Sequence, residues 1–242
     1  MKVITFDIHY GIYHFETEYL DAELHAHPVI EVLMAEQGTF ALKTPLVDAS
    51  QLHFAIIDAQ TLHQITATNC EVKLLMLESY NSLFKDFLAQ LGITFKNGIF
   101  IAQPLLDTDN IYQQITAFIR EQSLQQTPDE RVNACLQIFR EKDLEYHQMI
   151  NSLKSATFLS ESRLSHLFKE HIGISLKKYL VWTKLKKTIA YLLQEETNLT
   201  QSSLQAGFYD QAHFTNAFKK LLGISPSKVY NSRTLQFLFP PA

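Results

Sequence analysis

Four residues in the N-terminal third of the chain have side chains that can bind a metal ion: His25, His27, Glu31 and His63. Alternate residues of a strand share one face, so His25 and His27 are expected to point the same way, and Glu31 follows at the same parity. A later strand paired with this one would bring His63 to them. Three imidazoles and a carboxylate suit a divalent transition metal.

These residues lie in a stretch rich in short strand-like runs, from about residue 2 to residue 79. Polar and turn-forming residues separate the runs VITFDIHYGIYHFE, VIEVLMAEQGTFALK, HFAIID, HQITAT and VKLLMLES. Short runs at this spacing predict an antiparallel barrel or sandwich.

The order His-x-His, a nearby Glu31 and a later His63 resembles the cupin pattern, in which such residues converge inside a small barrel. The flanking turns differ from that pattern, because Tyr19 stands where a glycine is usual and Asp58-Ala59-Gln60 replaces Pro-x-Gly. Two interpretations remain open. The four side chains bind a metal, or they line an effector pocket and hydrogen-bond within the barrel.

Two amphipathic helices are predicted after the strands, at residues 80–91 and 109–126, with a short strand between them. Each has a single apolar stripe, which serves either as a dimer contact or as a cover for the barrel of the same chain. Residues 125–128 (QQTP) are the predicted linker, because proline restrains the residue before it and can start a helix.

A stretch in the C-terminal half occurs twice, as SESRLSHLFKEHIGISLKKY from residue 160 and DQAHFTNAFKKLLGISPSKV from residue 210, an offset of 50 residues (210 − 160). A repeat at fixed spacing indicates one supersecondary unit used twice. Each copy predicts a helix with Ser160 or Asp210 as its N-cap and Gly173 or Gly223 at its end.

A short apolar helix is expected before each copy, with Thr200 as the N-cap of the second one, so the unit is a helix-turn-helix built twice. Residues 175–195 predict one amphipathic helix between the copies, and residues 129–142 predict another before the first copy. The outer faces of the two repeated helices carry short polar or cationic side chains. Such faces suit base edges in the major groove of DNA.

With both Gly-Ile-Ser turns in register, residues 128–231 resemble the AraC/XylS family of bacterial transcription regulators. The segments LSESRLSHLFKEHIGIS and AGFYDQAHFTNAFKKLLGISPSKVY carry the resemblance. It implies two helix-turn-helix units joined by a long helix, recognition helices at about 161–172 and 211–222, a cupin-like sensor, and dimer contacts through the helices after the barrel.

Carried over from that family, the base-reading positions fall on Ser162, His166, Ala212 and Asn216, and they are flanked by Arg163, Ser165, His213 and Thr215. Phosphate contacts are expected from basic side chains, which position a protein without reading sequence: Lys169, Lys184, Lys187, Lys219 and Lys220. Two departures are Lys184 where the family usually has Arg, and Ser202-Ser203 where an aliphatic residue and Ala are usual. The helix before the second turn is therefore expected to be looser.

The net charge of −4 is unevenly distributed along the 242 residues. Residues 1–128 hold 6 basic and 15 acidic residues, a balance of −9, and residues 129–242 hold 15 and 10, a balance of +5. A basic half suits phosphate binding. Cys70 and Cys135 lack metal or disulfide spacing, and no apolar run is long enough to span a membrane, so a cytoplasmic protein without a membrane partner is expected.

The sequence thus predicts an α+β multidomain protein with a cupin-like β-barrel (1–79), a helical dimerisation region (80–127), a double helix-turn-helix domain (128–234) and a tail (235–242). The favoured function is a non-enzymatic, sequence-specific regulator, with double-stranded DNA, a small-molecule effector, a second copy of the chain and RNA polymerase as candidate partners. The alternatives are a metal-dependent cupin enzyme using His25, His27, Glu31 and His63, and a DNA-bound architectural protein with an inert barrel.

Overall fold

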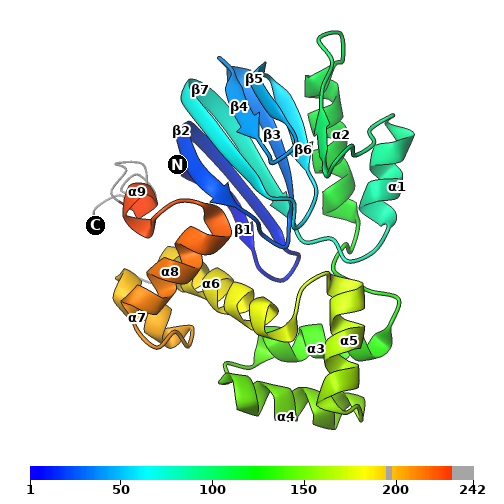
Figure 1. Cartoon of the computed structure of the whole chain (residues 1–242), viewed down its shortest axis with the longest axis vertical. Helices are drawn as coiled ribbons and strands as arrows, with labels where there is room; N and C mark the ends of the chain where they lie inside the picture. Colours follow the sequence, from blue (N-terminus) through cyan, green and yellow to red (C-terminus); the bar gives the residue numbers. More distant parts are fainter. Residues whose placement is uncertain (195–197, 231–242) are drawn as a thin grey trace. The chain divides into compact units, whose positions relative to one another are not determined.

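The computed structural model describes residues 1–194 and 198–230. Two compact units divide the chain: one holds residues 1–125 together with 218–230 of the described residues, and the other holds residues 126–217. Strands occupy the N-terminal part and helices the C-terminal part (Figure 1), so the predicted α+β class is confirmed. No helix within the described ranges is both long enough and apolar enough to cross a membrane.

The N-terminal unit is built on a single eight-stranded sheet, and the antiparallel pairing predicted from the short runs is confirmed. Its strands are β1 (Lys2–Asp7), β2 (Ile12–His25), β3 (Ile30–Gln37), β4 (Phe40–Lys43), β5 (Asp48–Leu52), β6 (Phe54–Ile57), β7 (His63–Leu77) and β8 (Ile99–Ile101). The hydrogen-bonded order is β1-β2-β7-β3-β6-β8, and β4 joins β5 to β7. The late strand β8 therefore extends the sheet beyond the predicted boundary at residue 79.

Strand β7 organises the sheet, since β2, β3 and β4 all pair with it. The sequence predicted two separate runs here, at residues 63–68 and 72–79. They form one strand because Asn69 takes a positive φ of 53° at an irregularity in the pairing with β2. Asparagine tolerates that conformation, and such a bulge bends a strand without ending it.

Helices α1 (Leu83–Gln90) and α2 (Thr108–Glu121) lie beside the sheet (Figure 1). Asp107 begins α2 by accepting a hydrogen bond from the Asn110 N–H at 3.0 Å. Their apolar stripes join the core of the sheet through these buried residues: Phe84, Leu88, Ile111, Tyr112, Ile115 and Ile119. The two helices therefore cover the sheet of their own chain, which is one of the two uses that the sequence left open.

The remaining helices are α3 (Glu130–Glu141), α4 (Tyr146–Thr157), α5 (Glu161–Ile172), α6 (Leu176–Gln194), α7 (Leu199–Gln205), α8 (Gln211–Leu222) and α9 (Pro226–Tyr230). The predicted caps Ser160 and Asp210 accept from backbone N–H groups three residues on, and Gly173 and Gly223 take positive φ values of 82° and 69°. The order helix, turn, helix thus occurs twice, with α6 between the copies. The predicted tail at 235–242 lies outside the described residues.

One local prediction in this half was wrong. Asn198, not Thr200, caps α7, and it forms a reciprocal capping box with Gln201. Ser202 and Ser203 are fully buried, on the packed side of α7. The hydroxyl of Ser203 donates to the carbonyl of Thr200 at 2.9 Å, which satisfies that polar group inside the helix.

An aromatic cluster holds the first helix-turn-helix together. Phe168 of α5 lies with its ring centroid 5.7 Å from Phe139 of α3 and 5.2 Å from Tyr179 of α6. All three side chains are at most 2% exposed. Helix α5 is therefore fixed by its apolar face, which leaves the opposite face free.

Candidate nucleic-acid interface and a buried histidine cluster

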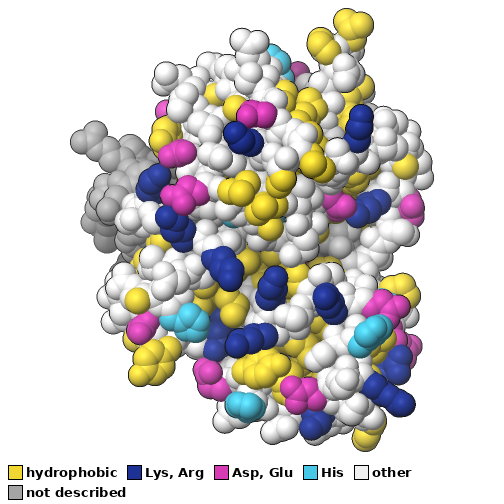
Figure 2. Space-filling view, in the orientation of Figure 1, with side chains coloured by type: hydrophobic (Ala, Val, Ile, Leu, Met, Phe, Trp, Pro, Cys, Tyr) yellow, Lys and Arg dark blue, Asp and Glu magenta, His cyan; other side chains and the backbone are white. Residues whose placement is uncertain are grey.

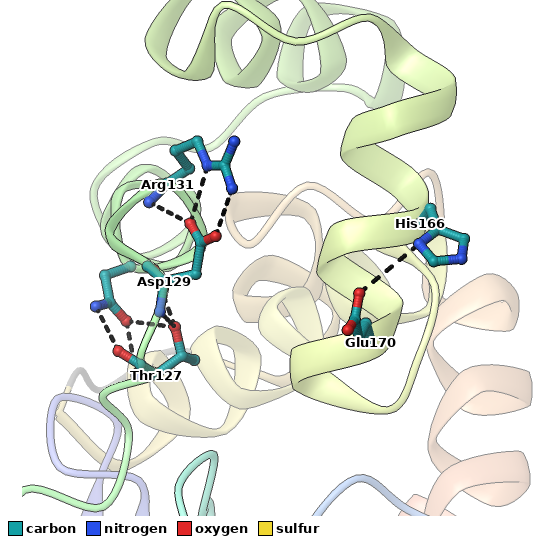
Figure 3. Close-up of polar contacts among 6 residues, drawn as sticks. Thr127, Asp129, Arg131, His166 and Glu170 are labelled. Carbon is teal, nitrogen blue, oxygen red and sulfur yellow. Dashed lines mark hydrogen bonds and ion pairs between the residues drawn. The ribbon is translucent and has the colours of Figure 1, made fainter.

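The outer face of α5 carries the predicted base-reading residues of the first unit. Ser162, Arg163 and His166 are exposed, and Ser165 is half-buried. Leu164 and Phe168 on the opposite face are completely buried, as the i, i+4 spacing of an amphipathic helix requires. His166 points away from the helix with its Nδ1 3.8 Å from an oxygen of Glu170 (Figure 3). That carboxylate is an acidic neighbour of His166 that was not predicted from the sequence.

The N-terminal turns of α8 repeat this arrangement in the second unit. Ala212, His213 and Asn216 are exposed, Thr215 is half-buried, and Phe214 is buried against the ring of Phe208 at 5.3 Å. Both recognition helices therefore present a solvent-facing polar surface on a rigid apolar base.

Three predicted phosphate contacts are exposed to solvent, namely Lys169 of α5 and Lys219 and Lys220 of α8. The ammonium group of Lys219 also lies 3.0 Å from a carboxylate oxygen of Glu23. Figure 2 shows lysine and arginine side chains gathered over the helical, lower part of that view, with acidic side chains among them. Such a mixed surface agrees with the modest basic excess of the C-terminal half.

Lys184 and Lys187 are placed differently from the prediction. Their side chains in α6 are only 10% and 8% exposed, and both are paired within the protein. Lys184 donates to Glu145 at 3.1 Å and to the carbonyl of Gly207, and Lys187 donates to Asp143. Neither ammonium can neutralise a DNA phosphate without losing these partners, so their assignment to phosphate is corrected to a role inside the domain.

The two turns also differ, although the repeat predicts equal ones. In the first unit Phe158, which is 94% exposed, takes the left-handed conformation with φ of 55°. In the second unit Gly207 takes the left-handed conformation with φ of 88°. With the 50-residue offset of the repeat, Gly207 corresponds to residue 157 (207 − 50), one residue before Phe158. No sequence signal marks Phe158, because glycine is the residue expected at such a position.

The four predicted metal ligands do come together in the N-terminal unit. His25 lies opposite His63 in the pairing of β2 with β7, and Glu31 lies near the start of β3. His27 follows the end of β2, so the predicted strand alternation is not what places it. Ligand nitrogens of the three histidines lie within 4.8 Å of one another, and all four side chains are at most 5% exposed.

Backbone carbonyls fix the tautomer of each imidazole. The Nδ1 atoms of His25, His27 and His63 lie 2.8, 3.1 and 2.8 Å from carbonyl oxygens of residues 23, 29 and 61. A carbonyl can only accept, so each Nδ1 carries its hydrogen and each neutral ring offers Nε2 as a ligand. Hydrogen bonds of this kind, from the ring nitrogen that does not bind the metal, orient histidines around metal ions.

Glu31 faces two of these free nitrogens, with one oxygen 3.1 Å from Nε2 of His27 and 3.0 Å from Nε2 of His63. The second approach lacks hydrogen-bond geometry, and Nε2 of His63 is a buried nitrogen without a hydrogen-bond partner among the described residues. An unsatisfied ring nitrogen beside a buried carboxylate fits a cation at this position.

The electrostatics of the cluster follow from burial and from these neighbours. Burial lowers the pKa of His25 to about 4, and the nearby His63 and His27 act in the same direction. Burial alone would lower the pKa of His63 as well, but the Glu31 carboxylate raises it above its ordinary value. Burial would raise the pKa of Glu31, yet the two histidines hold that pKa well below its usual range.

Two helix-turn-helix units, each with an exposed polar face on its second helix, place the C-terminal half of the chain in the helix-turn-helix class. Residues 153–232 match the family model described as "Helix-turn-helix domain". Over 107 residues the chain is 32% identical to the arabinose operon regulatory protein of Salmonella typhimurium, covering 44% of this chain and 38% of that protein. It is 26% identical over 129 residues to the Msm operon regulatory protein of Streptococcus mutans, covering 51% and 46%.

The matched segments thus span less than half the length of these relatives. Residues 153–232 are thus similar to the helix-turn-helix domains of transcription regulators, and the family resemblance drawn from the two repeats is confirmed. The relatives are regulators rather than enzymes, in agreement with the expected absence of catalysis.

Solved structures show the same fold over both parts of the chain. ToxT of Vibrio cholerae, solved with an unsaturated fatty acid bound, matches with a TM-score of 0.56 at 11% identity over 90% of this chain and 93% of ToxT. Another ToxT structure matches with a TM-score of 0.53 at 13% identity over 96% and 98%. At these identities the likeness concerns the fold alone.

Proposed function

We propose that the protein is a sequence-specific transcription regulator whose N-terminal sheet unit senses a small molecule. The carrying observation is the pair of recognition helices, α5 and α8, each held by a buried apolar face and each with an exposed polar face. Two such helices about 34 Å apart reach successive turns of the major groove.

The base-reading roles follow from side-chain chemistry. Asn216 can pair bidentately with adenine, and the methyl group of Ala212 can contact that of thymine. His166 and Ser162 would read the neighbouring groove from α5, where a carboxylate oxygen of Glu170 lies 3.8 Å from Nδ1 of His166. The exposed lysines, Lys169, Lys219 and Lys220, would bind phosphates and set the register.

The test is selection of bound duplexes from a random DNA pool, followed by affinity measurements on the selected site. Asn216→Ala is expected to cost about 1–3 kcal/mol on that site and to relax the preference at one position. Lys219→Ala is expected to weaken selected and unrelated DNA equally and to reduce the salt slope by about 1. A uniform loss with Asn216→Ala would remove its base-reading role.

A small-molecule effector is the second part of the proposal. It rests on the fold that the N-terminal unit shares with ToxT, a protein crystallised with an unsaturated fatty acid. Screening ligands by thermal shift is the direct assay, because a ligand that binds only the folded protein raises its melting temperature. A ligand that also changes the protein's affinity for the selected DNA would support sensing. If no ligand binds the sheet unit, the architectural alternative is favoured.

We further propose that His25, His27, His63 and Glu31 hold a divalent transition metal. The fit is carried by the converging ring nitrogens, by the carbonyls that fix each Nδ1–H, and by Nε2 of His63, which has no hydrogen-bond partner within the described part of the chain. When bound, such a metal supplies a Lewis-acidic centre to which an anionic or carbonyl effector can bind. The protein residues position it and keep it dry.

Metal content of protein purified without chelator and without a His-tag tests this proposal by plasma mass spectrometry. About one transition metal per chain is expected, and it should be lost in the His25→Ala, His63→Ala double variant but kept in His9→Ala, an exposed histidine outside the cluster. Metal retained by the double variant would refute the site. Turnover assays on the loaded protein would test the enzymatic alternative.

The remaining partners are a second copy of the chain and RNA polymerase. Because α1 and α2 already cover their own sheet, a dimer would use what they leave exposed, including Leu83 at 45%. Light scattering with and without Leu83→Lys tests that contact. Transcription in vitro from a promoter bearing the selected site tests the polymerase and separates activation from repression.

A further inference from the structure

Lys184, in the middle of the connecting helix α6, has an ammonium group that bonds to both helix-turn-helix units. It donates to the carboxylate of Glu145, the residue that begins α4 of the first unit, at 3.1 Å. It also donates to the carbonyl of Gly207, in the turn between α7 and α8 of the second unit. All these residues belong to the same compact unit.

The surroundings of this lysine are built around it. A Cβ on Gly207 would lie 3.2 Å from Cε and 3.3 Å from Nζ of Lys184, so the side chain packs against the bare backbone of a residue with φ of 88°. Lys187, one turn later on α6, bonds to Asp143 just before α4. The hydroxyl of Tyr191 reaches the same carboxylate at 3.4 Å.

We propose that Lys184 is a positioning residue for DNA recognition: its two bonds set the distance and orientation between recognition helices α5 and α8. The inference rests on the proposed DNA-reading function. The Glu145 bond ties α6 to the entry of the first unit, and the Gly207 bond ties α6 to the turn that aims α8. Helix α6 alone sets the distance between the two units. How each unit is rotated about its end of α6 depends on such side-chain contacts.

The consequence concerns the spacing of the DNA site rather than its bases. A composite site is read only when both helices reach their grooves together, so a fixed inter-helix geometry selects one spacing. With Lys184→Met, which keeps most of the buried volume and loses the ammonium, each unit should still read its own half-site. The penalty for a wrongly spaced site should shrink, and affinity for the correct one should fall.

The first experiment needs no DNA. Spin labels on Ser162→Cys and Ala212→Cys, both exposed, report the distance between α5 and α8 by pulsed electron resonance, and the natural Cys70 and Cys135 are buried. The distance distribution is expected to broaden with Lys184→Met and to stay narrow with Lys184→Arg, since the guanidinium can reach both partners. Lys177→Met, an exposed lysine of the same helix, is the matched control.

The second experiment uses the DNA site selected with the unaltered protein. Inserting one base pair between its half-motifs should weaken binding roughly tenfold for the natural protein and for Lys177→Met, but only about two- to threefold for Lys184→Met. Should Lys184→Met fail to fold, Glu145→Gln removes the charge from one of the two bonds and carries the same expectation. An unchanged distance distribution in the folded variant would overturn the inference, as would equal broadening by Lys184→Arg.

The two readouts also separate this inference from the proposed function. If the labels broaden as expected but no DNA sequence is selected, Lys184 does set the geometry and the DNA-reading proposal is refuted. If a sequence is selected and its spacing penalty is identical in Lys184→Met and in the natural protein, the DNA-reading proposal stands and the role of Lys184 is refuted.

Discussion

Replacing Phe168 by alanine should remove most of what fixes the first recognition helix. The ring is 0% exposed and contacts Phe139 and Tyr179 at centroid distances of 5.7 and 5.2 Å. Truncation of a buried phenylalanine costs about 3–5 kcal/mol. Aromatic pairs contribute about 0.5–1.5 kcal/mol beyond area burial, so the loss here should lie in the upper part of that range.

The chain provides a matched control ten residues earlier (168 − 158), because Phe158 is 94% exposed. Phe158→Ala removes the same atoms without opening a cavity, and alanine keeps the Cβ that the positive φ strains. Its effect should stay within about 0.5 kcal/mol, as is usual for surface substitutions. The difference between the two variants therefore isolates the contribution of burial.

Urea unfolding followed by fluorescence is the assay, because Trp182 is the only tryptophan and is buried in α6, within the same compact unit. Phe168→Ala should lower the midpoint strongly at an unchanged slope. A loss below about 1 kcal/mol, or one equal to that of Phe158→Ala, would show that the three-ring cluster does not hold α5 and would refute the reasoning.

Three further changes are predicted. Phe158→Gly should stabilise the helical unit by about 1 kcal/mol, since glycine takes a positive φ without the steric cost that a Cβ imposes, and the Trp182 unfolding curve measures it. Asp107→Ala should lower the free energy of unfolding by about 1 kcal/mol through loss of the α2 cap, measured by circular dichroism melts. An unchanged melting curve would show that this cap does not stabilise the protein. Glu78→Ala should lower the free energy of unfolding by about 3 kcal/mol, because this fully buried carboxylate accepts from Tyr13, Tyr80 and Gln125, and its removal leaves those donors without an acceptor. A smaller loss than that caused by Glu78→Gln in the same melts would contradict this reasoning.

The sequence predicted what depends on neighbours along the chain. Ser160 and Asp210 lie at helix starts because their side-chain oxygens accept from the first turn, and the glycines of the two Gly-Ile-Ser turns lie at helix ends because they take a positive φ. The repeat also gave the order of the helices, since a duplicated unit repeats its local signals. Even so, the predicted cap Thr200 was wrong, because Asn198 can also accept from the first turn and its reciprocal bond with Gln201 makes it the cap.

What depends on distant residues was predicted less well. Lys184 and Lys187 have the composition of a phosphate-binding face, but Glu145, Gly207 and Asp143, which lie far from them in sequence, bury and pair them. A lysine where the family usually has arginine was the signal that this position matters. The partner could not be read from spacing, because it lies 39 residues before Lys184 (184 − 145).

The histidine cluster came together for a partly different reason from the one predicted. His25 and His63 meet because β2 and β7 pair in register, as expected for neighbouring strands. His27 instead reaches Glu31 from the turn after β2, where its carbonyl accepts from the N–H of Gln60 at 2.8 Å. Residue types were therefore a better guide here than strand parity.

An excess of lone pairs over donors decides what this cluster can accept. Each Nδ1–H is used by a carbonyl, so the neutral rings and the Glu31 carboxylate face one another with acceptors only. The Glu31 carboxylate raises the pKa of His63 above its ordinary value, so a proton on that ring is favoured by its neighbour. His25, with a pKa of about 4, stays neutral at pH 7 and keeps its Nε2 lone pair. A divalent cation would satisfy all these acceptors together, so adding metal should stabilise the protein. If lowering the pH stabilised it markedly and adding metal did not, the four residues would instead form a hydrogen-bonded cluster that binds no metal.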